Sequence, residues 1–234
     1  MPPKPKFTRE EVVNTALELV RRRGIGALTS RELGTALGSS ARPIFTVFRD
    51  MDEVKSAVRE QARLCFVEYM QVAESFQPAY KKRGMQWVRF AREEPMLFQL
   101  LFMQRTGDHS DFSQAMEIIP FGKEDDIAII MRDYHATPEQ AEHLFRQMWI
   151  HTYGLCVLCA TKVCAFTDEE IAANLGEIFC GMIYILHGSF VQSMSRTPAQ
   201  KGTPEVNLYW RDYPDLRSAE SRRRMRREKY EICH

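Results

Sequence analysis

Hydroxyl and guanidinium groups gather in the short segment at residues 38–50, whose sequence is GSSARPIFTVFRD. We expect Ser40 to cap a helix of about seven residues there, with Pro43 in its first turn, where a missing N–H costs nothing. The residues expected to project from the outer side are Ser39, Ala41, Arg42 and Thr46. An arginine at the start of a helix in the DNA major groove can bridge O6 and N7 of guanine. The segment therefore has the chemistry needed to contact base edges.

Groups suited to phosphate contacts flank this segment on both sides. They are Thr29, Ser30 and Arg31 at the start of the preceding helix, Arg49 and Lys55 after the segment, and Lys4 and Lys6 near the N-terminus. Hydroxyls, a guanidinium and free backbone N–H groups at a helix start bind anions, and a short basic arm can reach an adjacent minor groove. Such contacts set affinity and register without reading sequence.

The elements that must position these groups begin at recognisable caps. Thr or Asp is followed three residues later by Glu or Gln at residues 8, 29, 50, 137 and 167, which is the capping-box pattern. We expect helices over about 9–23, 30–38, 51–75, 138–163 and 168–194, and two more separated by Pro95. The segment at 106–122 is typical of a loop, and no long alternating strand pattern appears. The chain is predicted to be all-α, with a glycine turn at Gly38–Ser39 between two short helices, as in a helix-turn-helix.

The net charge of +1 over 234 residues is unevenly distributed. Residues 1–56 hold ten Lys and Arg against seven Asp and Glu, residues 57–196 thirteen against eighteen, and residues 197–234 nine against six. A positive excess in a small N-terminal unit fits contact with a polyanion, whereas the acidic middle argues against a chain that wraps nucleic acid. No apolar run is long enough to span a bilayer and no signal peptide is visible, so we expect a soluble cytoplasmic protein.

Residues 7–58 resemble the N-terminal domain of TetR-family transcriptional regulators. The matching positions are Val13, Ala16, Leu17, Gly24, Leu28 to Leu33, Leu37, Gly38, Ile44, Phe45, Phe48 and Asp52 to Val54. Further on, RFAREEPMLFQLLFM at 89–103 and WIHTYGL at 149–155 are similar to an effector domain with a Trp-His-Gly signature. Members of this family carry Tyr, His and Lys as phosphate ligands where this chain has Phe45, Val47 and Met51, so we expect weaker general affinity for DNA but intact base readout.

The resemblance implies a helix-turn-helix DNA-binding domain at 1–56 and a helical ligand-binding and dimerisation domain at 57–196. Residues 197–234 are rich in Pro and aromatic residues and carry a run of Arg near their end, which indicates a strap with a basic tail. The resemblance also implies a ligand-responsive regulator, expected to be a repressor, that binds a palindromic operator as a homodimer. The two long helices at 138–163 and 168–194 would form the interface. The second of these is apolar on nearly all sides, which requires cover that one chain does not supply. The expected interface residues are Gly181, Tyr184 and Gly188.

Aromatic and Met side chains in the middle of the chain predict a cavity for a small apolar effector. The expected lining residues are Trp87, Phe90, Phe98, Phe102, Met103, Trp149 and Tyr153. The alternative interpretation is that these side chains belong to the hydrophobic core and line no cavity. His151 and His187 are expected to be hydrogen-bonded core residues.

Two other classes of protein remain open. Cys156, Cys159 and Cys164 allow a redox- or metal-sensing regulator, although buried thiols are the better interpretation because no four-ligand set is complete. A protein-binding helical adaptor with a degenerate DNA-binding domain is the second alternative. No catalytic motif is visible, so we predict neither an enzyme nor a cofactor nor a metal site.

Overall fold

The computed structural model describes residues 5–74, 79–104 and 123–186. Among them it contains eight α-helices, two short 3-10 helices and no strand, which confirms the all-α prediction for this part of the chain. The α-helices are α1 (Arg9–Arg23), α2 (Ser30–Ala36), α3 (Met51–Glu74), α4 (Ala79–Glu93), α5 (Pro95–Phe102), α7 (Lys123–Tyr134), α8 (Pro138–Ala160) and α9 (Asp168–Leu186), and the 3-10 helices are η1 (Ile25–Ala27) and η2 (Arg42–Thr46). The predicted loop at 106–122, the last residues of the helix predicted at 168–194, and the strap and tail at 197–234 lie outside the described residues.

The capped helix starts are those that the sequence predicts. The hydroxyl of Thr8 accepts the backbone N–H of Glu11 at 3.1 Å, and the carboxylate of Glu11 in turn accepts the backbone N–H of Thr8. Thr137 caps α8 in the same reciprocal way, and Asp50 accepts the N–H of Glu53 at 2.9 Å before α3. Each bond satisfies a backbone donor that has no partner inside its helix.

The short helix that follows α2 differs from the prediction. It is the five-residue 3-10 helix η2, whose N-cap is Ala41 with no side-chain cap bond, so the prediction that Ser40 caps a seven-residue helix is wrong. The reason is the tight turn before it: the backbone of Ser40 and Ala41 lies 2.9 Å from the place where a Cβ on Gly34 would be. Residues 39–41 therefore pack against α2 and the helix begins only afterwards. Pro43 lies in its first turn, as predicted.

Helix α7 has no counterpart in the sequence prediction. Its apolar residues Ile127, Ile130, Met131 and Tyr134 follow the spacing i, i+3, i+4, i+7 of an amphipathic helix. The charged start KEDD and the irregular segment before it obscure this pattern. α7 packs mainly on α8, and Ile130 is fully buried.

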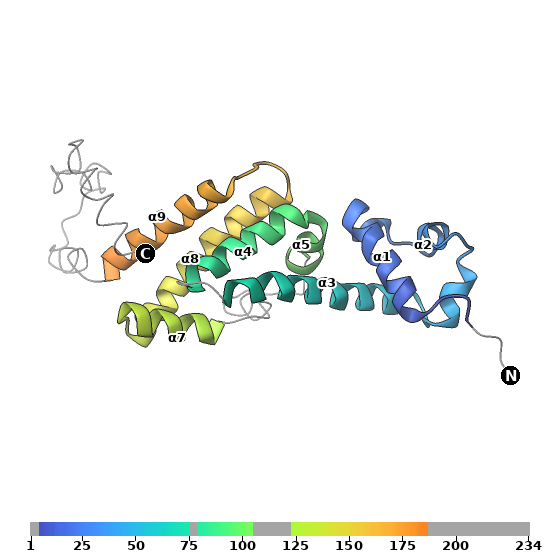
Figure 1. Ribbon diagram of the computed structural model, residues 1–234, viewed down its shortest axis with the longest axis horizontal. Helices are drawn as coiled ribbons and strands as arrows, with labels where there is room; N and C mark the ends of the chain where they lie inside the picture. Colours follow the sequence, from blue (N-terminus) through green and yellow to red (C-terminus); the bar gives the residue numbers. More distant parts are fainter. Residues whose placement is uncertain (1–4, 75–78, 105–122, 187–234) are drawn as a thin grey trace, which may run out of the picture.

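Helix α3 connects the two ends of the molecule (Figure 1). α1, α4 and α5 pack against α3, with α1 and α2 at one end of the molecule. α8 and α9 pack against α4 at the other end, and α7 packs against α8. Residues Val54, Val58, Ala62 and Phe66 of α3 are fully buried and recur every four positions, which places one continuous face of α3 in the core. The expected domain boundary at residues 56–57 falls inside this helix.

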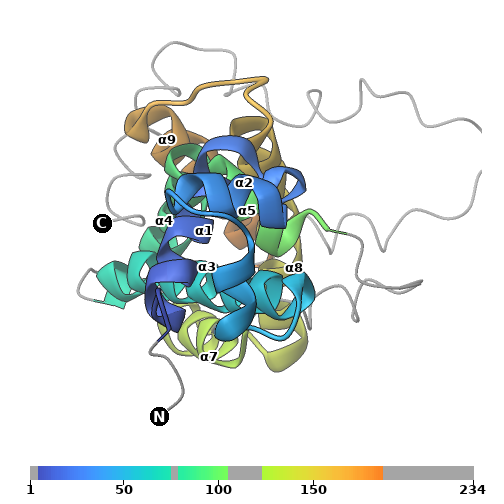
Figure 2. The same cartoon turned by 90° about the vertical axis from the view of Figure 1, so that its right-hand side faces the viewer.

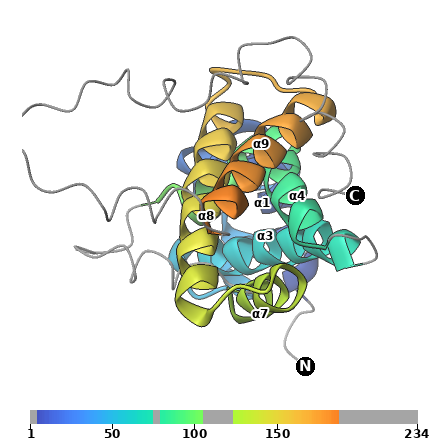
Figure 3. The ribbon, with the colours of Figure 1, turned by 90° about the vertical axis from the view of Figure 1, so that its left-hand side faces the viewer.

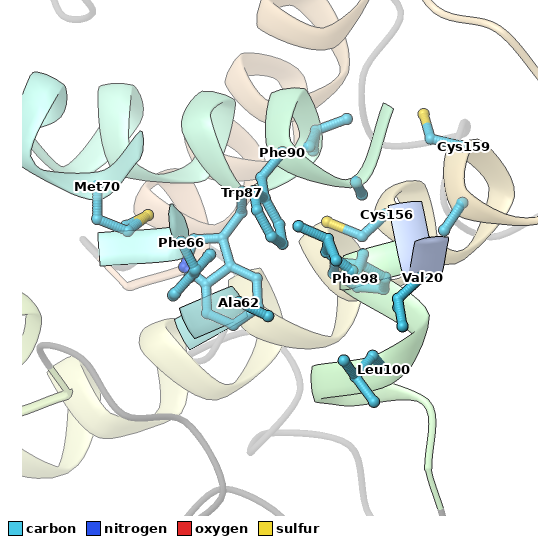
Figure 4. Packing of buried hydrophobic residues seen from close by; sticks show 14 of the residues in the cluster. Val20, Ala62, Phe66, Met70, Trp87, Phe90, Phe98, Leu100, Cys156 and Cys159 are labelled. Atoms are coloured by element: carbon cyan, nitrogen blue, oxygen red, sulfur yellow. The ribbon is translucent and has the colours of Figure 1, made fainter. Parts of the chain in front are cut away.

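A single hydrophobic core runs along α3. Side chains from α1, α3, α4, α5 and α8 meet in it (Figure 4). Phe66 stands at its centre, with ring centroids 4.8 Å from Trp87, 5.2 Å from Phe90 and 5.0 Å from Phe102 in edge-on geometry, an arrangement that aromatic quadrupoles favour. Because the core continues between the N-terminal helices and the larger bundle, the two groups of helices are packed against each other.

Candidate nucleic-acid interface and ligand cavity

The turn between α2 and η2 is a Schellman motif followed by a close backbone approach. Gly38 has φ +62, its N–H donates to the carbonyl of Thr35 at 3.0 Å, and the N–H of Ser39 donates to the carbonyl of Gly34 at 2.9 Å. A left-handed residue that ends a helix in this way is usually glycine, because a Cβ strains the conformation. The turn thus fixes η2 at a defined position beside α2, at the end of the molecule that faces the viewer in Figure 2.

The side chains predicted to contact DNA around this turn are exposed or half-buried. Arg42, Phe45 and Thr46 of η2 are exposed, and so are Thr29 and Arg31 at the start of α2. Ser30, Ser39 and Ala41 are half-buried and Ser40 is exposed. Within the part of the chain that the structure describes, neither Arg31 nor Arg42 forms a salt bridge, so both guanidinium groups can bind an outside anion without breaking an internal one.

The other predicted phosphate ligands already have internal partners. Lys6 donates to the hydroxyl of Ser39 at 2.9 Å, which ties the basic arm to the turn. Arg49 pairs with Asp50 at 2.8 Å and Lys55 with Asp52 at 3.3 Å. A phosphate would compete with these neighbouring carboxylates. Lys4 lies outside the described residues.

Arg9 stabilises this end of the molecule, although the sequence pattern does not single it out. Its guanidinium lies 4.1 Å from the centre of the Phe48 ring and donates to the carbonyl of Val47 at 3.2 Å and to Glu53 at 2.8 Å. These contacts join the start of α1 to the joint between η2 and α3. Val47 and Met51, at two positions where TetR-like domains carry phosphate ligands, are half-buried and pack against the core.

A cavity opens between α4, α7, α8 and α9 in the larger bundle. It holds about 870 Å³ of space not occupied by protein atoms, part of it open to solvent. The lining residues are Tyr80, Lys81, Arg83, Gly84, Trp87, Asp126, Tyr134, Phe145, Met148, Trp149, Thr152, Tyr153, Leu175, Gly176 and Phe179. Trp149 and Tyr153 stack in it with ring centroids 5.1 Å apart.

Three of the seven predicted lining residues are in this wall: Trp87, Trp149 and Tyr153. Phe90 and Phe98 are fully buried core residues instead, because Phe90 turns toward α3, where its ring lies 5.2 Å from that of Tyr69. α5 packs against α1, α3, α4 and α8, and none of its residues lines the cavity. Its end therefore places Phe102 and Met103 at the edge of the core, where Phe102 accepts a bond from the hydroxyl of Tyr153 at 2.8 Å.

Sequence reasoning missed the charged groups of the cavity. Arg83 of α4 and Asp126 of α7 form an ion pair of 2.6 Å, with side chains only 17% and 12% exposed. Burial raises the pKa of Asp126 to about 6, although Arg83 draws it down, and burial also raises the pKa of Tyr80 well above its ordinary value. The signal in the sequence that could have identified Asp126 is the apolar spacing of α7, which predicts a helix beginning near this residue.

The candidate sensing residues are mostly enclosed. Cys156 and Cys159 are buried and Cys164 is exposed, and burial raises the pKa of the first two thiols. No group of three His, Cys, Asp or Glu side chains suited to a metal ion occurs among the described residues. The prediction that His151 is hydrogen-bonded is wrong for one ring nitrogen, since its Nε2 is buried without a hydrogen-bond partner in the described chain. His187 lies outside that part.

Helices α8 and α9 lie side by side in Figure 3, and both carry exposed apolar side chains. These are Ile150 of α8 and Ile178, Tyr184 and Ile185 of α9, with Tyr184 53% exposed. A Cβ added to Gly181 would meet nothing within 4 Å. We call these five residues the outer apolar face. Gly188 is outside the described residues.

No protein-family model matches the chain, and a search of curated proteins finds no significant match. None of the helices in the described ranges is both long and apolar enough to cross a membrane.

Proposed function

We propose that the protein is a ligand-responsive transcriptional regulator that binds a palindromic DNA operator as a homodimer. The observation that carries this proposal is the fixed turn between α2 and η2, with Arg31 and Arg42 exposed beside it and free of salt bridges in the described chain. This arrangement is compatible with a helix-turn-helix, in which the second helix contacts base edges and the first contacts the backbone. The resemblance of residues 7–58 to TetR-family regulators supports the same function.

Homodimerisation is supported by the outer apolar face. Exposed apolar surface on two adjacent helices favours association with a matching surface, and a two-fold dimer presents the same patch from both subunits. One subunit alone contacts one half-site, so a dimer is what makes a palindromic site selective.

Ligand control is supported by the way α4 joins the cavity to α1. One face of α4 lines the cavity through Tyr80 and Trp87. Beyond its last turn, Glu94 pairs with Arg21 of α1 at 3.1 Å. The sulfur of Met96 lies 3.3 Å from the place where a Cβ on Gly24 would be. A shift of α4 on ligand binding would therefore displace α1, the helix that precedes α2 and η2.

The test is selection of duplexes from a random pool by the full chain, followed by anisotropy titrations at several salt concentrations. We expect an inverted repeat to be enriched and the logarithm of the affinity to fall linearly with the logarithm of the salt concentration. A protein-binding adaptor would show neither the enriched repeat nor salt-dependent binding, and that outcome would refute the regulator.

A further inference from the structure

The walls of the cavity carry more positive than negative charge. Its charged residues are Lys81, Arg83 and Asp126. Arg83 and Asp126 neutralise each other across 2.6 Å, whereas the ammonium group of Lys81 has no ion-pair partner in the part of the chain that the structure describes. The half-buried Lys81 is thus the cation of the site that remains available to a ligand.

The rest of the wall suits an apolar body. The rings of Trp87, Trp149 and Phe179 and the side chain of Leu175 surround the space. Gly176 contributes no side chain, and a Cβ there would meet nothing within 4 Å, so the wall is open beside α9. Apolar walls with few polar groups are typical of sites that orient a ligand by one polar head.

A cationic ligand fits these walls poorly. To pair with Asp126 it would have to displace Arg83, whose guanidinium would then be left nearly buried and unpaired, and an unpaired buried charge is strongly unfavourable. A neutral ligand would leave Lys81 without a partner. An anionic head pairs with Lys81 and keeps the Arg83–Asp126 pair intact.

We propose that the cavity binds an apolar molecule with one carboxylate group, whose head pairs with Lys81 and whose body lies among the aromatic rings. The inference rests on the proposed function only in identifying this molecule as the effector. Binding itself requires no DNA.

The test compares isosteric probes by calorimetry on the full chain at pH 7.5. One set is 2-naphthoate, 2-naphthamide and 2-naphthylmethylammonium, and a second is decanoate, decanamide and decylammonium. The two sets differ in their apolar part, so a poor fit of one apolar group does not prevent the charge preference from being measured. We expect the carboxylate of at least one set to bind about tenfold or more tighter than its amide, the effect of one charge-assisted bond. Lys81→Gln should abolish that preference. Lys82→Gln should keep it, since this neighbouring lysine does not line the cavity.

Three results would overturn the inference: an ammonium probe that binds tightest, a carboxylate preference that survives Lys81→Gln, or no binding by any of the six probes at millimolar concentration. The same titrations separate this inference from the proposed function. If the carboxylate binds as expected but leaves the affinity for the selected duplex unchanged, the ligand class stands and the regulatory role fails.

Discussion

At the scale of single residues, Arg42 and Arg31 have different expected roles although both are exposed and free of salt bridges in the described chain. Arg42 begins η2 and Arg31 lies in the first turn of α2. We expect Arg42→Ala to cost about 1–3 kcal/mol of binding free energy and to relax the preference at one base position of each half-site. Arg31→Ala should weaken cognate and random duplexes alike, because a phosphate contact carries no base information.

Competition anisotropy with every single-base variant of the selected duplex measures both effects. Arg132→Ala is a suitable control, since Arg132 lies on α7 and pairs with Asp133. Equal losses on cognate and random DNA for Arg42→Ala would contradict its role in base readout.

Asp126 should make stability depend on pH in an unusual direction. Its pKa of about 6 lies above that of an ordinary aspartate because burial disfavours the charged form. Between about pH 4 and pH 6 the folded protein therefore holds a proton that the unfolded chain has released, so the free energy of unfolding falls as pH rises. Relative to Asp126→Asn, the wild type should lose about 2 kcal/mol of stability between pH 4 and pH 7.

Urea unfolding of both proteins across this pH range provides the measurement. The charged groups that act on Asp126 are Arg83 and Asp125, and both are unchanged in the variant. A difference that grows in favour of the wild type as pH rises would mean that attraction to Arg83 outweighs burial.

At the scale of elements, the position of η2 depends on Gly34. A Cβ there would lie 2.9 Å from both the nitrogen of Ala41 and the carbonyl carbon of Ser40, which are backbone atoms that cannot rotate away. Gly34→Ala should therefore lower the free energy of unfolding by about 1–3 kcal/mol, the usual effect of overpacking, even though alanine favours helices. It should also weaken DNA binding by displacing η2.

The matched control is Gly26→Ala. An added Cβ at Gly26 meets nothing within 4 Å, so we expect little change in stability. Urea unfolding followed by circular dichroism compares the two variants. Equal stability of the Gly34 and Gly26 variants would show that the turn relaxes freely.

At the scale of the whole molecule, the outer apolar face is the surface expected to pair two copies of the chain. Gly181 is exposed, and a Cβ added there would meet no atom of the described chain within 4 Å. Gly181→Arg should therefore leave the subunit folded while placing a bulky charge in the interface. We expect a monomer in sedimentation and loss of binding to the palindromic duplex.

Circular dichroism establishes that the Gly181→Arg variant is folded, and Asn14→Arg on the exposed side of α1 controls for added charge. A folded variant that stays dimeric would place the interface on another surface.

What the sequence alone determined is local. Caps such as Thr8 with Glu11 or Thr137 with Gln140 act within three residues, and Pro95 interrupts the helix wherever it is packed. The starts of the capped helices and the break between α4 and α5 could therefore be predicted, whereas the starts of η2 and α7 could not. The chemistry responsible lies within one turn of backbone, independent of the rest of the chain.

Only the tertiary structure decided which side chains face the cavity. Trp87 and Phe90 belong to the same helix and are both aromatic, yet one lines the cavity and the other packs on α3. Arg83 and Asp126 are 43 residues apart, and their pairing depends on how α7 packs against its neighbours. The start of η2 was decided in the same way, by the contact of residues 40 and 41 with Gly34. Such outcomes depend on close packing between elements distant in sequence, which residue spacing does not encode.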